Sequence, residues 1–450
     1  MKAIRKLCLG ISALSLVLLF VGLFSGNTSI WQPAAVVLSV SAAIGIGAIP
    51  ALANYQYTAW IITAVVAGMI YPAAFLKWGD FDLRNKWLIL LIVQLVMFGM
   101  GIQMSLKDFS GLGSTGKGVL IGLICHFSIM PLMGLLLTRV FHFETEIAAG
   151  IILIGSCSSG LASNVMVYIA RANLVLSVTV TAMATLVAPF MTPLLMKLLA
   201  GTLIDIKFIG MMMEIVKIVI VPIGAALIHD YLKTASPKGW RNLKLISGIS
   251  AVWLLALAFG LWDALNISSS EEMMHSLEIL SFFAGAIIVG LLYHLATLKF
   301  DKLDSLMPYV SMFGIVYFTT VTTAAGRDNL LKVGLILFLS SVIHNAAGYF
   351  FGYYLSRWFG LDKPSSRTVA FEVGLQNGGM ASGLAGSMGK LGTVGLAAAV
   401  FSPWMNISGS ILANYWRKKS FKEEAESGGS FNTSDSDIHS NHLVSTPKTS

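Results

Sequence analysis

The feature that most constrains this chain is a succession of apolar runs, each roughly 20 residues long. Clear examples cover residues 88–104, 118–137 and 174–196. The hydrocarbon core of a bilayer is about 30 Å thick, a distance that roughly 20 helical residues cross. Because lipid offers backbone groups no hydrogen-bond partner, a segment that crosses it must be a helix or a strand of a closed barrel. Runs of this length predict an all-α polytopic membrane protein.

The composition agrees with this prediction and disfavours other classes of protein. Mean hydropathy is +0.78 and only 12% of residues are charged, about half the usual share in soluble domains. We attribute the net charge of +8 to basic loops on one side of a membrane rather than to nucleic-acid binding. The cysteines lie in apolar runs, so neither a disulfide framework nor a CxxC metal site is expected. With no phosphate loop or nucleotide fingerprint, we expect no enzymatic activity and no organic cofactor.

Fourteen apolar segments are predicted to span the membrane, in two sets of seven. The first set covers residues 8–24, 33–53, 57–76, 87–105, 116–138, 147–170 and 173–196. The second set covers residues 208–229, 245–265, 276–297, 304–323, 331–356, 366–388 and 391–415. Residues 1–24 also fit a cleaved signal peptide. Since no small-residue cleavage site precedes the next segment, we expect a retained first helix.

The two sets carry the same landmarks in the same order, which suggests a duplication. The spacing His-x7-Gly-x4-Arg-x-Phe occurs in both: His126, Gly134, Arg139 and Phe141 correspond to His344, Gly352, Arg357 and Phe359. The segment after each is interrupted by small and polar residues, at 155–164 and at 374–379. Each set then closes with a segment that contains a proline, Pro189 or Pro403.

Seven spans per repeat require that the two repeats insert with opposite orientation. With the N-terminus inside, about 19 Lys and Arg residues fall on the cytoplasmic side and about 9 outside, as the positive-inside rule requires. We therefore expect both termini to be cytoplasmic, in a plasma or bacterial inner membrane. Residues 417–450 are expected to form a disordered cytoplasmic tail, because from residue 423 onward they are mostly Ser, Thr, Asp, Asn and Gly.

The two interrupted segments are the candidate site. Freed backbone groups are tolerated in hydrocarbon only where they line a cavity, and inverted repeats place two such breaks opposite one another near the midplane. The carboxylate of Glu372 within an apolar segment is costly and therefore a functional candidate. The alternative is that its segment begins later and leaves Glu372 at the interface beside Arg367. Carboxylate, hydroxyl, amide and carbonyl oxygens suit Na+ rather than zinc or copper.

The chain resembles the bile acid:sodium symporter family. The resemblance rests on MFGMGIQMSLKDF (97–109), GSCSSGLASNVMVYIARANLVLSVTVTAMATLVAPFMTPLL (155–195), FEVGLQNGGMASGLA (371–385) and WMNISGSILANYW (404–416). It covers roughly residues 57–231 and 331–416. The resemblance implies a secondary transporter with inverted repeats, a core domain with two crossing broken helices, a moving panel domain and two sodium sites. The chain departs from it in having four surplus spans beyond the family's usual ten or so.

The resemblance also implies which residues bind the ions. The first sodium site would use Ser163, Asn164, Ser177, Thr181 and Glu372. The second would use Glu372, the carbonyls of Val373 and Leu375, the side chain of Gln376, and His126. The family has glutamine where this chain has His126, so one sodium ion, or a proton, could replace the second ion. A purely structural, hydrogen-bonding His126 is an equal alternative.

For substrate, the resemblance implies a small organic anion: a bile salt, pantoate, pyruvate or another 2-oxo acid. We expect Asn377, Asn406 and Ser163 to contact it. The alternatives are a proton-coupled anion carrier, an arsenite efflux carrier with Cys157 as thiol ligand, and a sensor that binds without transport. Elsewhere, Glu214 and Lys217 lie three residues apart on one predicted helix and are expected to pair.

The expected organisation follows from the repeats and the resemblance. Residues 1–56 form extra N-terminal helices, residues 57–200 the first repeat and residues 205–240 the start of the second. Residues 241–330 contain an extra helical pair. Residues 331–416 complete the second repeat with the sodium motif.

Overall fold

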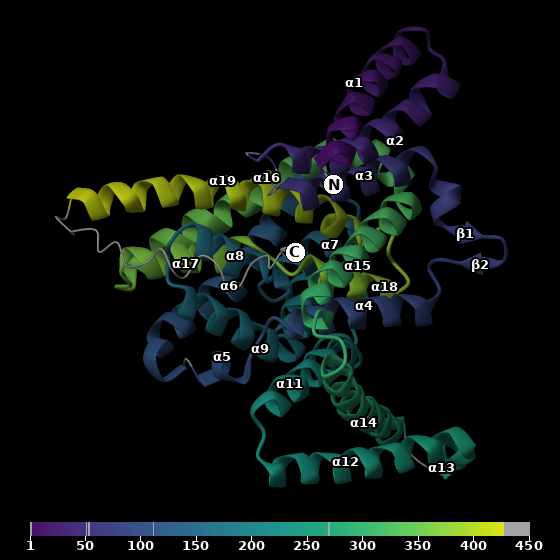
Figure 1. The fold of residues 1–450 in the computed structure, drawn as a ribbon, viewed down its shortest axis with the longest axis vertical. Helices are drawn as coiled ribbons and strands as arrows, with labels where there is room; N and C mark the ends of the chain where they lie inside the picture. The colour runs from purple at the N-terminus through teal and green to yellow at the C-terminus, as the bar shows by residue number, and fades with distance from the viewer. Residues whose placement is uncertain (1, 51, 53–54, 111, 269–270, 427–450) are drawn as a thin grey trace, which may run out of the picture.

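The computed structural model describes residues 2–50, 52, 55–110, 112–268 and 271–426, and these residues are almost entirely helical (Figure 1). A short hairpin, β1 (Lys77–Trp78) and β2 (Phe81–Asp82), interrupts the helices. The helices of the first half are α1 (Lys2–Phe24), α2 (Thr28–Gly45), α3 (Gln56–Ile70), α4 (Lys86–Gly101), α5 (Leu106–Ser110), α6 (Leu112–Phe141), α7 (Thr145–Ser156), α8 (Ala162–Ile169) and α9 (Leu174–Ala200).

The second half begins with a helix in two parts, α10 and α11, joined by a π-helical turn over Val216–Ile220. Its helices are α10 (Phe208–Ile215), α11 (Val221–Thr234), α12 (Pro237–Ala256), α13 (Trp262–Ser268), α14 (Glu271–Thr297), α15 (Leu303–Ala325), α16 (Arg327–Trp358), α17 (Lys363–Gly374), α18 (Gly378–Ser387) and α19 (Leu396–Glu426).

This architecture confirms an all-α polytopic membrane protein. In the described part of the chain, ten helices are long and apolar enough to cross a membrane. Each of the fourteen predicted segments coincides with a helix or with consecutive helices separated by an irregular turn. The total of fourteen spans stays a prediction, because α3, α4 and the helices next to the two breaks are shorter than a full span.

Two helical pairs project from opposite ends of the molecule (Figure 1). At one end α1 packs against α2, and α2 leans on α3. At the other end α12 packs against α14, and α14 leans on α11. Exposed apolar side chains such as Leu14 and Phe20 on α1, and Val252 on α12, give both pairs a surface suited to lipid.

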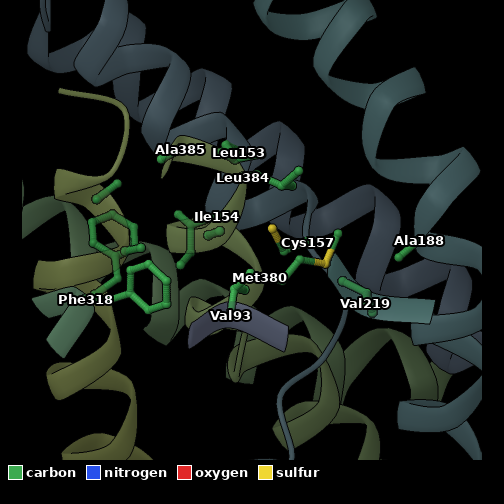
Figure 2. Close-up of a cluster of buried hydrophobic side chains, with 14 of the residues drawn as sticks. Val93, Leu153, Ile154, Cys157, Ala188, Val219, Phe318, Met380, Leu384 and Ala385 are labelled. Atoms are coloured by element: carbon green, nitrogen blue, oxygen red, sulfur yellow. The ribbon is translucent and has the colours of Figure 1, made fainter. Parts of the chain in front are cut away.

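The body between these pairs has an apolar core that buries residues 147–156 of α7 and 379–386 of α18. Figure 2 shows Leu153 and Ile154 of α7 in one apolar cluster with Met380 and Leu384 of α18. Small residues permit this close packing: a Cβ added at Gly155 would lie 2.7 Å from the carbonyl oxygen of Met130 on α6. The enclosure holds the two interrupted segments in a fixed position relative to each other.

The last helix is longer than the sequence led us to expect. The predicted tail began at residue 417, but α19 continues to Glu426. Lys, Arg, Glu and Ala dominate residues 417–426 and favour a helix, and Arg367 of α17 donates a hydrogen bond to Ser420 Oγ. The rest of the predicted tail, residues 427–450, lies outside the described residues.

Candidate functional site

The two breaks cross and pair with each other. The first lies between α7 and α8, the second between α17 and α18. Gly160 N donates to Leu375 O at 3.0 Å, and Asn377 N donates to Ser158 O at 2.8 Å. The two short extended segments therefore satisfy each other's backbone groups, which is why a Ser/Gly/Asn-rich interruption is stable inside the protein.

Side chains from neighbouring helices cap the carbonyl ends of the two half-helices before the breaks. Thr192 Oγ1 of α9 donates to Ser156 O at 2.7 Å. Asn345 Nδ2 of α16 donates to Gly374 O, also at 2.7 Å. The sequence analysis missed both residues. The signal it offered was a polar side chain within an otherwise apolar spanning segment.

The carboxylate of Glu372 lies at the centre of a cluster of hydroxyl groups. Its Oε1 accepts hydrogen bonds from Ser163 Oγ at 2.6 Å and from Ser177 Oγ at 2.5 Å. Its Oε2 accepts from Thr181 Oγ1 at 2.8 Å. Asn164 Oδ1 joins the cluster, 2.7 Å from Ser177 Oγ and 3.2 Å from Thr181 Oγ1. The structure thus brings all residues of the first predicted ion site together.

The position of Glu372 is buried inside the protein and does not depend on Arg367 beside it. Glu372 is 0% exposed and lies in the last turns of α17. Arg367 lies more than one turn earlier on the same helix and donates to Ser420. The carboxylate is therefore an internal group of the protein.

Hydroxyl hydrogens are too few for the oxygens of the cluster. Ser163, Ser177 and Thr181 carry one hydroxyl hydrogen each. Ser163 Oγ lies between the carboxylate and a backbone carbonyl, 2.6 and 2.8 Å away. The other two hydroxyls each lie between the carboxylate and Asn164 Oδ1. Ser159 Oγ, 3.3 Å from Ser163 Oγ and 3.5 Å from Leu375 O, adds a fourth hydroxyl, and Ser163 Oγ also lies 3.5 Å from Thr181 Oγ1. In all, nine contacts compete for four hydrogens. A cation among the oxygens, or a proton on the carboxyl group, would relieve the shortage.

The second predicted ion set is also brought together, but protein donors already occupy its carbonyl oxygens. Gln376 Nε2 donates to Val373 O at 2.6 Å. A backbone amide of the first break donates to Leu375 O. The backbone carbonyl of Glu372 lies 2.9 Å from His126 Nδ1. Each of these carbonyl oxygens keeps a second lone pair, and the side-chain oxygen of Gln376 has no partner among the described residues.

His126 and its repeat counterpart His344 differ in what they contact. His126 is fully buried on α6, with Nδ1 on Glu372 O and Nε2 2.8 Å from Cys157 O. It therefore joins the end of one broken helix to the end of the other. A neutral ring has one N–H and can donate to one of these carbonyls, whereas an imidazolium donates to both. His344 Nε2 contacts Met130 O of α6 instead.

The three predicted substrate residues lie in different surroundings. Asn377 caps α18 by accepting from Met380 N at 2.9 Å, while its buried Nδ2 has no partner among the described residues. The buried Gln376 Oε1 beside it likewise has none in the described part of the chain. Asn406, in contrast, donates back to Ser402 O within α19. Ser163 belongs to the Glu372 cluster.

A second buried ionic cluster lies outside the crossing. Lys217 Nζ lies 3.1 Å from Glu214 Oε1, which confirms the expected pair, and 2.8 Å from Glu278 Oε1 of α14. The pocket beside it has a volume of about 770 Å³ and is lined mostly by apolar side chains of α4, α11 and α14. Cys157 is fully buried in the apolar cluster of Figure 2.

Comparison with known proteins agrees with this geometry. The model of the Sodium Bile acid symporter family matches residues 88–270. The chain is 31% identical to the uncharacterized sodium-dependent transporter YocS of Bacillus subtilis (strain 168), over 84% of this chain and 96% of that protein. It is 27% identical to the probable sodium/metabolite cotransporter BASS1, chloroplastic, of Arabidopsis thaliana, over 81% of this chain and 74% of the relative. Identity to the human ileal sodium/bile acid cotransporter is 26%, over 64% of this chain and 65% of the relative.

Proposed function

This chain belongs to the sodium bile acid symporter family and is a multi-pass membrane transporter, and from that premise we propose that it carries a small organic anion together with Na+ by alternating access. The observation that carries the proposal is that the oxygen atoms around Glu372 make more short contacts with one another than there are hydroxyl hydrogens to bridge them. A buried carboxylate with neutral hydroxyl neighbours needs a positive charge that comes and goes, which is what a coupling ion supplies.

We assign the coupling ion to the oxygens of Glu372, Ser163, Ser177, Thr181 and Asn164 and propose that one Na+ is bound there. The carbonyls of the second set accept hydrogen bonds from Gln376, His126 and a backbone amide. A second ion would have to share those carbonyl oxygens with their protein donors. The proton-coupled alternative remains an outcome of the test, because protonation of the carboxyl group would relieve the same shortage.

We place the substrate at the crossing, where α8 and α18 begin. The first N–H groups of a helix attract an anion, and no side chain caps α8. The unpartnered Asn377 Nδ2 adds a donor within the described residues. A small carboxylate such as pyruvate or pantoate suits these donors, and the names of the relatives extend the class to bile acids and other metabolites.

The movement we propose follows from the packing. Helices α6–α9 and α16–α19 hold the crossing in one rigid core, while α3, α4, α11 and α15 pack against one another beside it. Binding of Na+ would order the crossing, and this second group of helices would rock against the core to expose the site to one side and then the other. We propose that residues 57–200, with 205–240 and 331–416, form the inverted repeats, and that both termini face the cytoplasm across an inner or plasma membrane.

The test is uptake of labelled pyruvate, pantoate and taurocholate by proteoliposomes, with sodium or proton gradients imposed or collapsed. We expect one of the three to accumulate only with an inward sodium gradient. Thr181→Val should weaken sodium dependence, and Thr185→Val is the matched control, because Thr185 lies one turn away and its hydroxyl donates to Thr181 O rather than to the Glu372 carboxylate. Uptake driven by a proton gradient without sodium would replace Na+ by H+, and equal behaviour of the two variants would contradict the assigned ion site.

A further inference from the structure

Four successive carbonyl oxygens at the end of α17 each lie against a hydrogen-bond donor. The pairs of acceptor and donor are Glu372 O with His126 Nδ1, Val373 O with Gln376 Nε2, Gly374 O with Asn345 Nδ2, and Leu375 O with Gly160 N. Three of these acceptors belong to residues assigned to the predicted ion sites. The fourth, Gly374, lies between Val373 and Leu375 and is held from α16 by Asn345, at 2.7 Å.

The short side chain of Asn345 reaches the end of α17 because α16 passes close to it. Gly348 lies three residues after Asn345 on α16, and a Cβ added there would lie 2.8 Å from Gly374 Cα. A larger residue at this position would push the two helices apart and lengthen the contact between Asn345 and Gly374 O. Asn345 itself is 1% exposed, so bulk water does not reach the amide group to replace it.

Two further side chains fix the orientation of the Asn345 amide. Gly374 O can only accept a hydrogen, so the amide nitrogen faces it and Oδ1 is left free to accept. Ser408 Oγ of α19 donates to this Oδ1. Tyr349 OH of α16 lies 3.2 Å from Ser408 Oγ. A chain of hydrogen bonds therefore runs from Tyr349 through Ser408 and Asn345 to the end of α17.

We propose that Asn345 is a positioning residue for the coupling ion and that Ser408 and Tyr349 hold it in place. Its acceptor Gly374 lies two residues after Glu372, in the same turn of α17. Holding this turn sets where the Glu372 carboxylate meets the hydroxyl groups of α8 and α9, as outer groups orient the ligands of other metal sites. The inference rests on the proposed sodium site and adds a residue from a helix to which no ion ligand is assigned.

Thr192 makes the same kind of bond at the other break and therefore provides a comparison. Its Oγ1 donates to Ser156 O, the last carbonyl of α7, also at 2.7 Å. None of the assigned ion ligands lies on α7, and the first of them, Ser163, follows on α8 beyond the break. Loss of either cap removes a donor from a buried carbonyl and should reduce stability. Loss of Asn345 should in addition weaken ion binding.

The experiment compares Asn345→Leu with Thr192→Val, each of which replaces a polar group by an apolar one of similar size. The melting temperature of the purified full-length protein is recorded over a series of NaCl concentrations, with choline chloride keeping the ionic strength constant. Uptake into proteoliposomes gives the half-saturating sodium concentration.

We expect both variants to melt at a lower temperature than the unaltered protein when sodium is absent. In Asn345→Leu the half-saturating sodium concentration should rise by about tenfold or more, the usual effect of losing a group that orients a metal ligand. At saturating sodium its maximal uptake rate should approach that of the unaltered protein, because every assigned ion ligand is still present. A purely structural role would not produce this separation of affinity from rate.

Two more variants test the chain of hydrogen bonds that holds Asn345. Ser408→Ala and Tyr349→Phe each remove one hydroxyl group, at increasing distance along the chain. The rise in half-saturating sodium should therefore decrease from Asn345→Leu to Ser408→Ala to Tyr349→Phe. Ser341→Ala is the control, because Ser341 lies one turn before Asn345, is buried, and donates to a carbonyl oxygen of its own helix. Its half-saturating sodium concentration should not change.

The results distinguish a failure of this inference from a failure of the proposed function. If sodium affects neither melting nor uptake of the unaltered protein, the sodium site is wrong and the role of Asn345 is wrong with it. If sodium acts on the unaltered protein and Asn345→Leu keeps its affinity, or Thr192→Val loses as much, Asn345 is only a structural cap. Should Asn345→Leu fail to fold, unchanged sodium affinity in Ser408→Ala would contradict the proposal.

Discussion

Two clusters of carboxylates in this molecule, one fully buried and one partly exposed, are balanced in different ways. At the crossing, Glu372 accepts hydrogen bonds from three neutral hydroxyl groups. Between α10 and α14, Glu214 and Glu278 share the ammonium group of Lys217, at 3.1 and 2.8 Å. The second cluster holds its cation covalently on the chain, whereas we propose that the first obtains one from solution. On this proposal, a carboxylate inside the protein acts as a structural group when a lysine of the chain neutralises it, and as a transport site when an ion from solution does.

Both clusters lie where a helix is irregular, but the kind of irregularity differs. The π-helical turn over Val216–Ile220 contains Lys217, and Gln94 Nε2 of α4 donates to the Lys217 carbonyl oxygen at 3.2 Å. The break beside Glu372 instead pairs with a second break. In the first case a single side chain supplements the turn, and in the second two freed backbones and a set of oxygens meet, which is the arrangement that can accommodate a mobile ion.

The largest expected effect is that of neutralising Glu372. Glu372→Gln keeps the shape of the side chain but removes the charge that Na+ balances, so uptake should fall by at least about 100-fold. The melting temperature of the unaltered protein should be higher in NaCl than in choline chloride, because an ion that binds the folded state stabilises it. That difference should vanish in Glu372→Gln.

Glu278→Gln provides the control for this effect. It removes a buried carboxylate of the other cluster while Glu214 remains 3.1 Å from Lys217. Its melting temperature should keep its sodium dependence. If Glu278→Gln lost that dependence, or Glu372→Gln retained it, the division between a mobile and a fixed counter-charge would be wrong.

The next effect concerns the fixed cation. Lys217→Met leaves Glu214 and Glu278 without their shared ammonium group, and breaking a buried ion pair costs about 3–5 kcal/mol. Since these carboxylates are 30% and 36% exposed, we expect the lower end of that range, measured as a loss of unfolding free energy or melting temperature. The protein that remains folded should bind Na+ with unchanged affinity.

A compensated variant sharpens this result. Adding Glu214→Gln and Glu278→Gln to Lys217→Met removes all three charges together and should restore most of the lost stability. A triple variant as unstable as Lys217→Met would show that packing around the lysine stem, rather than charge balance, accounts for the loss.

Much of the fold could be predicted from the sequence because the membrane simplifies the problem. Apolar runs of about 20 residues mark helices irrespective of their partners, and all fourteen predicted segments coincide with helices. The breaks were predictable because Ser, Gly and Asn within such runs stand out. Glu372 stood out for the same reason, although its partners Ser177 and Thr181 on α9 were assigned only through the family resemblance.

What the sequence could not supply was contact between distant segments. Lys217 contacts Glu278, which lies 61 positions away in the sequence, and His126 contacts the carbonyl oxygen of Glu372, which lies 246 positions away. No local sequence pattern predicts either contact. The caps Thr192 and Asn345 were overlooked because a single polar residue in a spanning helix has many possible partners. The extension of α19 was missed because its basic residues also fit an interfacial loop.

A smaller effect is expected from removing one hydroxyl ligand. Thr181→Val deletes a hydroxyl 2.8 Å from the Glu372 carboxylate, and a hydrogen bond to a charged group contributes about 1.5–3 kcal/mol. The sodium concentration for half-maximal uptake should rise by about tenfold or more, with little change in the maximal rate. Thr185→Val should leave it unaltered. A change confined to the maximal rate would place Thr181 outside the ion site.

The smallest expected effect is on the sodium stoichiometry, and it tests how far the crossing depends on a mobile charge. With one ion at Glu372, the Hill coefficient for Na+ should be about 1, and the nearby carbonyl oxygens of Val373 and Leu375 should keep their protein donors. His126→Gln replaces the ring, which has no oxygen, by a side-chain amide whose oxygen can coordinate a cation. We expect the coefficient to rise above 1 in this variant as that oxygen becomes available to a second ion. A coefficient near 2 in the unaltered protein would contradict a single ion. It would mean that the carbonyl oxygens near Glu372 bind a second Na+, so that only mobile ions balance the charge at the crossing.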